Sequence, residues 1–396
     1  MPRRSRTRRL LAAMTAGALI VPAVAACSNG SGGGPGTVKI GLLVSLSGVY
    51  KVLGEELRDG FQLYLDTHGG KLGGRQVELV VADEGAGGDA AVPLAEKLIK
   101  QDRVQVLTGI VSSATYQVLT PKVQEAKVTM IGANGRPAVD SVQGVWATSF
   151  ITQQFGSSIA KYIKDQVDGP VWAMAADYAA GQALMKGFTD AFSQVGGQLA
   201  NPDHKPTMTP AKDMKNFLPY LAGIKASGAK AVYCFYAGDQ AVDFVKQYHQ
   251  SDAADLPLYS AAALTEGTLL TAEGDAATGI RTNAYYASNL DNEANRRFVA
   301  EWDKKHPGVT PDSYLVQSYD VAKVLDLGLA AAGNDLSYEA INRALGSLGK
   351  IDSPRGEWQF SEKTHTPVQK WYMREVRKDG RALSNVVIQD LATIGD

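Results

Sequence analysis

Four polar turns in the sequence contain residues that could bind a small anion. They are 45–50 (SLSGVY), 108–116 (TGIVSSATY), 130–137 (MIGANGRP) and 175–181 (AADYAAG), and each follows an apolar run. In open α/β sheets, ligands collect where strands end and helices begin, because free N–H groups point at them there. A serine before a helix is also a common N-cap, so one such turn alone indicates little. Four of them in one fold favour a binding site.

Residue patterns for catalysis, nucleotide binding or metal binding do not occur in the sequence. No G-x-G-x-x-G follows the first strand, and there is no P-loop or G-x-S-x-G turn. The five histidines are far apart, and no H-E-x-x-H or cysteine pair supplies metal ligands. Asp83 and Glu84 are adjacent, and neighbours on a strand point apart, so we interpret them as solvated loop carboxylates. We therefore expect a protein that is not an enzyme and uses no metal or cofactor.

The elements that must position these turns alternate along the first part of the chain. Runs with the composition of buried parallel strands are 37–46, 76–82, 103–109 and 128–132. Helical patterns between them cover 53–65, 90–100 and a stretch from about Ala114. This alternation predicts a parallel sheet with helices on both faces.

The same alternation of strand-like and helical runs begins again after residue 168. Further strand-like runs are 169–176, 229–238, 256–261 and 278–288, and Cys234 reads as a small buried residue on one of them. Helical patterns cover 181–195, 241–248 and 292–348, the last with a break at 307–308. The tail alternates like two strands with a turn at 378–380. Because roughly 360 residues exceed one comfortable core, we expect two domains.

The first 36 residues have the pattern of an export signal followed by a tether. Five arginines and no acid precede an apolar run over 10–26 that is too short to span a membrane. Residues 24–27 (VAAC) resemble the lipobox of bacterial lipoproteins, which implies cleavage before Cys27 and acylation of its thiol. Residues 28–36 are rich in Gly and Ser and predict a flexible linker. Sec and twin-arginine export both stay open.

The charge balance bears on possible partners. Without the five signal arginines, 35 of the 40 basic residues remain against 41 acidic ones. This negative balance argues against a nucleic-acid partner, and no later stretch is apolar enough to span a bilayer. We expect a monomer that is lipid-anchored on the extracytoplasmic side of a bacterial cell membrane.

Longer stretches resemble the extracytoplasmic solute-binding proteins of ABC transporters, in the branched-chain amino acid receptor (leucine/isoleucine/valine-binding) group. The resemblance covers 38–387 and rests on 39–66, 69–84, 177–188 and 352–360 together. It implies an α/β, type I periplasmic binding protein fold, with two Rossmann-like lobes of parallel strands joined by three crossovers near residues 149, 281 and 353. The implied division is a signal peptide (1–26), a lipidated cysteine and linker (27–36), lobe 1 (37–149 and 282–352) and lobe 2 (150–281 and 353–396).

The resemblance also implies a set of candidate ligand-binding residues. They are Tyr50, Ser112, Ser113, Asn134, Gly135, Arg136, Phe150, Asp177, Tyr178, Tyr236, Ala237 and Gly238. Ser113 matches the serine that receives the ligand carboxylate in the family's amino-acid receptors. For Arg136, two interpretations stay open: its planar fork pairs with a ligand carboxylate, or it points to solvent.

The places where the sequence departs from the family pattern bear on the ligand. Amino-acid receptors of the family hold the α-ammonium group with acids at positions that read 150–154 (FITQQ) and 261–264 (AAAL) here, without a carboxylate. An unpaired buried ammonium costs several kcal/mol, so an α-amino acid fits poorly unless Asp177 serves instead. Residues 353–360 and 235–248 resemble the subgroup that binds aromatic acids, and Tyr50, Phe150, Tyr178 and Tyr236 would suit a flat ring.

The sequence therefore predicts a receptor that captures a small aromatic or other carboxylate between two closing lobes and delivers it to ABC permease subunits. Two alternatives stay open. One is a receptor of the same family for branched-chain or other amino acids. The other is a lipoprotein that senses a ligand for a signalling partner.

Overall fold

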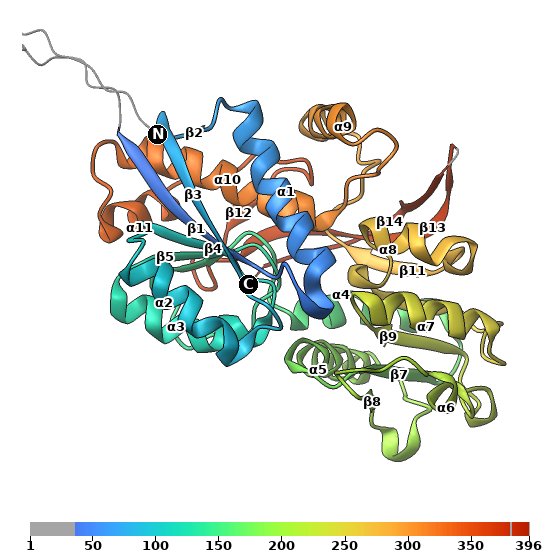
Figure 1. Ribbon diagram of the computed structural model, residues 1–396. Helices are drawn as coiled ribbons and strands as arrows, with labels where there is room; N and C mark the ends of the chain where they lie inside the picture. The colour runs from blue at the N-terminus through green and yellow to red at the C-terminus, as the bar shows by residue number, and fades with distance from the viewer. Residues whose placement is uncertain (1–35, 381, 396) are drawn as a thin grey trace, which may run out of the picture. The chain divides into compact units, whose positions relative to one another are not determined.

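A computed structural model of the chain describes residues 36–380 and 382–395 (Figure 1). The predicted signal peptide, Cys27 and the linker up to residue 35 lie outside the described residues. Within the described ranges, no helix combines the length and the apolar composition that a membrane crossing requires.

The first sheet has six strands in the order β2-β3-β1-β4-β5-β6. They are β1 (Thr37–Val44), β2 (Lys71–Leu72), β3 (Arg75–Asp83), β4 (Val106–Gly109), β5 (Thr129–Gly132) and β6 (Val145–Ala147). Every pair is parallel except β2 with β3. The central strands β1 and β4 are mostly apolar and buried because successive side chains point to opposite faces and both faces are covered.

Helices cover both faces of this sheet (Figure 1). α2 (Val92–Lys100) and α3 (Ser113–Ala126) pack on the face that includes Leu43 and Leu107. α1 (Lys51–Thr67) and α10 (Ser313–Ala332) pack together on the other face, although they are far apart in the sequence. α9 (Glu293–Lys305) and α11 (Tyr338–Gly346) flank α10 in the chain.

The second sheet has eight strands in the order β12-β13-β11-β10-β9-β7-β8, and β14 pairs with β13. They are β7 (Val171–Ala176), β8 (Thr207–Thr209), β9 (Ala231–Phe235), β10 (Leu258–Ala261), β11 (Arg281–Ala284), β12 (Gln359–Phe360), β13 (Pro367–Asp379) and β14 (Ala382–Ile394). The pairs from β8 to β11 are parallel, and those of β13 with β11, β12 and β14 are antiparallel.

The pleat of β9 sends its side chains alternately to two hydrophobic clusters. Tyr233 and Phe235 belong to the cluster under α4 (Gln153–Gln166) and α5 (Ala179–Gln194). Val232, Cys234 and Tyr236 belong to the cluster under α6 (Leu218–Leu221), α7 (Asp239–Gln250) and α8 (Gly267–Glu273). The prediction that Cys234 is a small buried residue is confirmed.

The chain passes between the two sheets three times, which confirms the predicted two α/β lobes with three crossovers. It leaves the first sheet after β6, returns after β11 to form α9, α10 and α11, and leaves again to form β12. The sheets are mixed rather than wholly parallel, because β2–β3 and β13–β14 are hairpins and a short connection joins only antiparallel strands. The predicted lobe boundaries stay a prediction. The helix α4 was not identified from the sequence.

Candidate ligand-binding site

A cavity of about 200 Å³ lies where strands of both sheets end. Its walls follow β1, β4, β5 and β6 of the first sheet and β7, β9 and β10 of the second, with α10 contributing a further wall. This is the place where open α/β sheets bind ligands. Eight of the twelve candidate residues line it: Tyr50, Ser112, Ser113, Asn134, Gly135, Phe150, Tyr178 and Ala237.

The turn between β4 and α3 has an unusual backbone. Gly109 has φ 95°, and Ile110, a β-branched residue, has φ 62° in the left-handed region. A Cβ on Gly109 would lie 2.3 Å from the carbonyl oxygen of Leu43, so only glycine fits there. The N–H of Ile110 donates to the same oxygen at 2.6 Å, which helps to hold the strained residue. Val111, which follows this turn, lines the cavity.

Glu84 lies beneath this turn, and our interpretation of it as a solvated carboxylate was wrong. It is 1% exposed and accepts the N–H groups of Val111 (2.6 Å) and Ser112 (3.0 Å). Burial raises the pKa of Glu84 to about 7, although these hydrogen bonds act in the opposite direction. Asp83 accepts the N–H groups of Leu46 (2.7 Å) and Gly85 (2.8 Å) instead of facing only water.

The start of α3 supplies polar groups to the cavity. The first N–H groups of a helix have no acceptor within it, and Glu84 accepts that of the N-cap residue Ser112 together with that of Val111, which precedes the helix. The next two, on Ser113 and Ala114, belong to residues that line the cavity. The Ser113 hydroxyl donates to the carbonyl of Gly135 at 3.1 Å. The helix start therefore offers N–H donors to an anion, and the Ser113 hydroxyl would join them by turning its proton away from Gly135.

The following loop is fixed to this turn by side-chain hydrogen bonds. The Asn134 amide donates to the carbonyl of Val111 at 2.7 Å, so the loops after β4 and β5 are tied together. A Cβ on Gly135 would lie 2.3 Å from the Phe150 ring, so a glycine here lets that ring pack closely on the loop. The geometry of this wall is thus set before any ligand binds.

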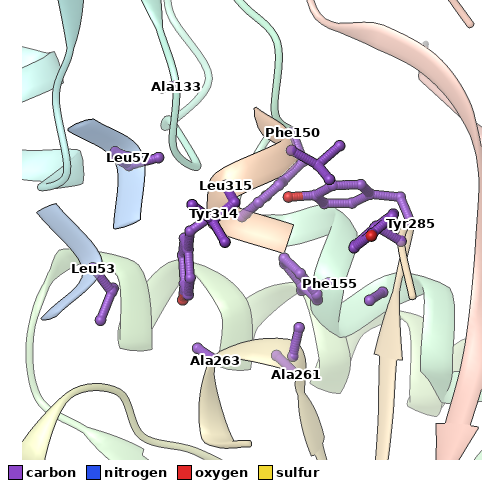
Figure 2. Close-up of a cluster of buried hydrophobic side chains, with 14 of the residues drawn as sticks. Leu53, Leu57, Ala133, Phe150, Phe155, Ala261, Ala263, Tyr285, Tyr314 and Leu315 are labelled. Atoms are coloured by element: carbon purple, nitrogen blue, oxygen red, sulfur yellow. The ribbon is translucent and has the colours of Figure 1, made fainter. Parts of the chain in front are cut away.

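Aromatic rings from both lobes surround the cavity. Tyr50 and Tyr178 meet edge to face, with ring centroids 6.2 Å apart, and Phe150 meets Phe155 in the same way at 4.4 Å. Figure 2 shows Phe150 and Phe155 with Tyr285 beside them, and Tyr314 of α10 nearer to Leu53 and Ala263. Burial raises the pKa of Tyr50 to about 12, so its phenol is neutral at physiological pH. Flat aromatic walls of this kind suit an aromatic ring.

The wall from the second lobe carries one charge. Ala179 and Ala180 belong to the first turn of α5, and Ala262 and Ala263 follow β10. Among the described residues that line the cavity, the only charged side chain is that of Lys212, which is exposed. The lining includes no acid, so it offers no counter-charge for an ammonium group.

Arg136 does not take either of the positions that we considered for it. It is 1% exposed, and its guanidinium donates to the carbonyl oxygens of Pro137 (2.8 Å) and Thr364. It therefore neither lines the cavity nor points to solvent. The reason is that its backbone pairs with the segment at Phe150 and Ile151, which turns the side chain toward the loop at 364.

Three other candidates also lie off the cavity. Asp177 is exposed and accepts a hydrogen bond from Gln182 at 2.7 Å. Tyr236 faces the opposite side of the sheet, where its ring packs on Phe244, because of the alternation along β9. Gly238 has φ 60°, and a Cβ there would lie 2.2 Å from the carbonyl oxygen of Val49. It marks a close contact between the two walls.

Sequence reasoning missed several residues that line the cavity. The polar ones are Thr152, Lys212, Ser313, Tyr314 and Gln317. The last three come from α10, which the sequence showed only as part of a long helical stretch. The general rule that helix starts gather at strand ends could have suggested Ser313, the first residue of α10. No local pattern marks Gln317, one turn further along that helix.

The fold and this cavity together define a two-lobed receptor for a small solute. The chain belongs to the periplasmic binding protein family, whose profile matches residues 37–381. A curated relative, Leu/Ile/Val-binding protein homolog 6 of Brucella melitensis biotype 1, is 29% identical over 367 residues, which are 91% of this chain and 93% of the relative.

Two solved structures of ABC transporter solute-binding proteins from R. palustris are also similar to this chain. One, in complex with benzoate, has a TM-score of 0.81 and 30% identity, and the match covers 91% of this chain and 98% of that chain. Another, in complex with 4-hydroxybenzoate, has a TM-score of 0.82 and 28% identity, with 89% and 96% covered. The predicted family, the type I periplasmic binding protein fold and the similarity to the aromatic-acid subgroup are thereby confirmed.

Proposed function

We propose that this chain is the receptor of an ABC importer and that its ligand is a small aromatic carboxylate. The observation that carries this proposal is the charge of the cavity, whose described lining includes Lys212 and no acid. The starts of α3 and α5 add N–H groups that favour an anion. A cavity of about 150 Å³ holds benzene, so about 200 Å³ leaves room for a ring with a carboxylate.

The similar structures support this ligand class. Two solute-binding proteins of comparable fold, at 30% and 28% identity, hold benzoate and 4-hydroxybenzoate. The cavity of this chain has aromatic side chains in both walls and lacks an acid that could hold an α-ammonium group. Both facts favour an aromatic acid over an α-amino acid.

Capture would work by movement of one lobe against the other. The two walls already touch where Gly238 approaches Val49 and where Tyr50 meets Tyr178. A ligand must therefore enter while the walls are apart, and their closure excludes water from it. No bond is made or broken in this process, and we assign the chain no enzymatic activity.

The family implies an extracytoplasmic location. We further propose that residues 1–26 direct export, that Cys27 is acylated, and that the linker 28–36 holds a monomeric receptor near the membrane. Its partners would be the permease subunits of the importer and the lipid bilayer.

A thermal-shift panel on the chain from residue 28 onward tests the proposed ligand class. Ligand at 100 times its dissociation constant adds about 2.7 kcal/mol to the stability of the folded state. We expect benzoates to raise the melting temperature and leucine, isoleucine and valine to leave it unchanged. A rise in the melting temperature with the amino acids alone would indicate an amino-acid receptor instead. Uptake of labelled benzoate that does not depend on this chain would favour the alternative of a signalling partner.

A further inference from the structure

Three carboxylates meet where the two lobes touch beside the ligand cavity. Glu56 belongs to α1 and Asp312 is the N-cap of α10, and both helices pack on the first sheet. Glu266 immediately precedes α8, in the segment that follows β10 of the second sheet. Leu53 and Ser313, which lie within one turn of these acids, line the cavity. The contact therefore joins the two lobes close to the place where a ligand would bind.

Two hydrogen bonds cross this contact in opposite directions. Glu56 accepts the backbone N–H of Thr268, and Glu266 accepts the backbone N–H of Ser313 at 3.2 Å. The approach is close because residue 267 is a glycine. A Cβ on Gly267 would lie 2.2 Å from a carboxylate oxygen of each of the two acids of the first lobe. These hydrogen bonds therefore exist only while the lobes are together.

One cation faces the three acids. Nη2 of Arg374 on β13 lies 2.6 Å from Oε1 of Glu266, and both side chains are buried. Among the described residues, no lysine or arginine forms an ion pair with Glu56 or Asp312. Oδ2 of Asp312 is buried and has no donor there, although it faces the Glu56 carboxyl group. Two ionised carboxylates offer only acceptors to each other, so this pair lacks a proton donor.

A proton shared by Glu56 and Asp312 supplies that donor and reduces the negative charge. Burial, followed by the charge of Asp312, raises the pKa of Glu56 well above its usual range. Burial, followed by the charge of Glu266, raises the pKa of Asp312 to about 7. The other titratable side chains near these acids are tyrosines whose pKa burial raises far enough to keep them neutral: Tyr285, Tyr286 and Tyr314. When the lobes separate, water solvates the acids and both pKa values return toward the ordinary range.

We propose that Glu56, Asp312 and Glu266 form a proton-linked latch, so that closure of the lobes takes up a proton and ligand affinity falls as the pH rises. The closed state binds more protons than the open state, and linkage then requires that acidity favours closure. This inference rests on the proposed function only in that a small ligand closes the lobes. It does not depend on which ligand that is.

Calorimetric titration of the full chain with benzoate at about pH 6 and about pH 8 tests the latch, because benzoate keeps its charge across this range. Uptake of one proton by a group that titrates near neutral pH should make binding roughly ten-fold weaker at the higher pH. The same titration at neutral pH in two buffers with different enthalpies of ionisation measures the proton directly. We expect uptake of a substantial fraction of one proton for each ligand bound.

Conservative variants separate the latch from other groups that titrate. Glu56→Gln should bind with a pH dependence below about three-fold, because the glutamine amide can accept from Thr268 and donate permanently to Asp312. Asp312→Asn replaces it if that variant fails to fold, since asparagine is an equally good N-cap. Glu55→Gln is the matched control on the same helix. The Glu55 side chain is 39% exposed and pairs with Lys51, so this variant should keep the full pH dependence.

Two results would overturn the latch and leave the proposed ligand class intact. One is benzoate binding that neither changes with pH nor takes up a proton. The other is a pH dependence that persists unchanged in Glu56→Gln and Asp312→Asn, as expected if Glu84 beneath the cavity wall took up the proton. If leucine binds and benzoate does not, the proposed ligand class fails. The same titrations with leucine, whose net charge is also constant in this range, then test the latch separately.

Discussion

Replacement of Glu84 by glutamine should change how the stability of the protein depends on pH. Glu84 is buried under the cavity wall, and burial raises its pKa from 4.5 to about 7. The folded state therefore binds the Glu84 proton more tightly than the unfolded state does. The resulting stabilisation is complete below about pH 4.5 and is lost as the pH rises through about 7.

The magnitude follows from the size of this shift. One pKa unit corresponds to about 1.36 kcal/mol, so between about pH 5 and about pH 8 the wild type should lose about 2 to 3 kcal/mol through Glu84. Glutamine cannot ionise, so this loss disappears in Glu84→Gln. The glutamine side chain has only one oxygen that can accept the N–H groups of Val111 and Ser112, so one of these hydrogen bonds is lost. This loss destabilises the variant by about 1–3 kcal/mol at every pH.

Urea unfolding followed by circular dichroism at a series of pH values measures both effects. The stability of the wild type relative to Glu84→Gln should fall by about 2 to 3 kcal/mol from about pH 5 to about pH 8, so that near pH 8 the variant should be about as stable as the wild type or more stable. Other buried acids such as Asp312, whose pKa burial raises to about 7, contribute equally to both proteins and cancel. Glu78→Gln, which replaces an exposed glutamate on β3, the strand that ends just before Glu84, is the control and should run parallel to the wild type. A difference that does not vary with pH would refute the reasoning.

Three further predictions concern the ligand and the membrane anchor. Ser113→Ala should weaken carboxylate binding roughly five- to hundred-fold in calorimetry, because a hydrogen bond to a charged group is lost; unchanged affinity would remove Ser113 from the site. Lys212→Ala should weaken it only about two- to five-fold and mainly at low salt, because the lysine is exposed; Lys215→Ala, a neighbouring exposed lysine off the cavity, should have no effect. Cys27→Ala should abolish acylation, and mass spectrometry of a wild-type mature chain that begins elsewhere than at an acylated Cys27 would contradict the anchor.

Much of the fold could be predicted from the sequence because its periodic patterns are local. The apolar run at 37–46 and the helical spacing of Leu53, Leu57 and Phe61 correspond to β1 and α1, which pack as expected. The helix α4 was missed, although its buried residues Phe155, Ile159 and Ile163 have helical spacing. The pattern of the tail correctly indicated two strands around a turn. We nevertheless predicted parallel sheets, and the hairpins β2–β3 and β13–β14 make both sheets mixed.

The site could be predicted only where a strand end and a helix start are visible in the sequence. Ser113 and Tyr178 are of this kind. Tyr236 was predicted to face the cavity but lies on the opposite side of the sheet. Successive side chains along β9 point to opposite faces, so its neighbours Phe235 and Ala237 line the cavity instead. Gln317 lies on α10 and Lys212 in the loop after β8, and their contact with the cavity depends on the assembly of both lobes, which no local pattern records.

The central claim is that the cavity selects an anionic carboxylate. Calorimetric titration with benzoate, benzamide and leucine tests it most directly, because the three are similar in size and differ in charge. The account predicts tight binding of benzoate, with benzamide at least tenfold weaker and no measurable binding of leucine. Tightest binding by leucine would contradict it.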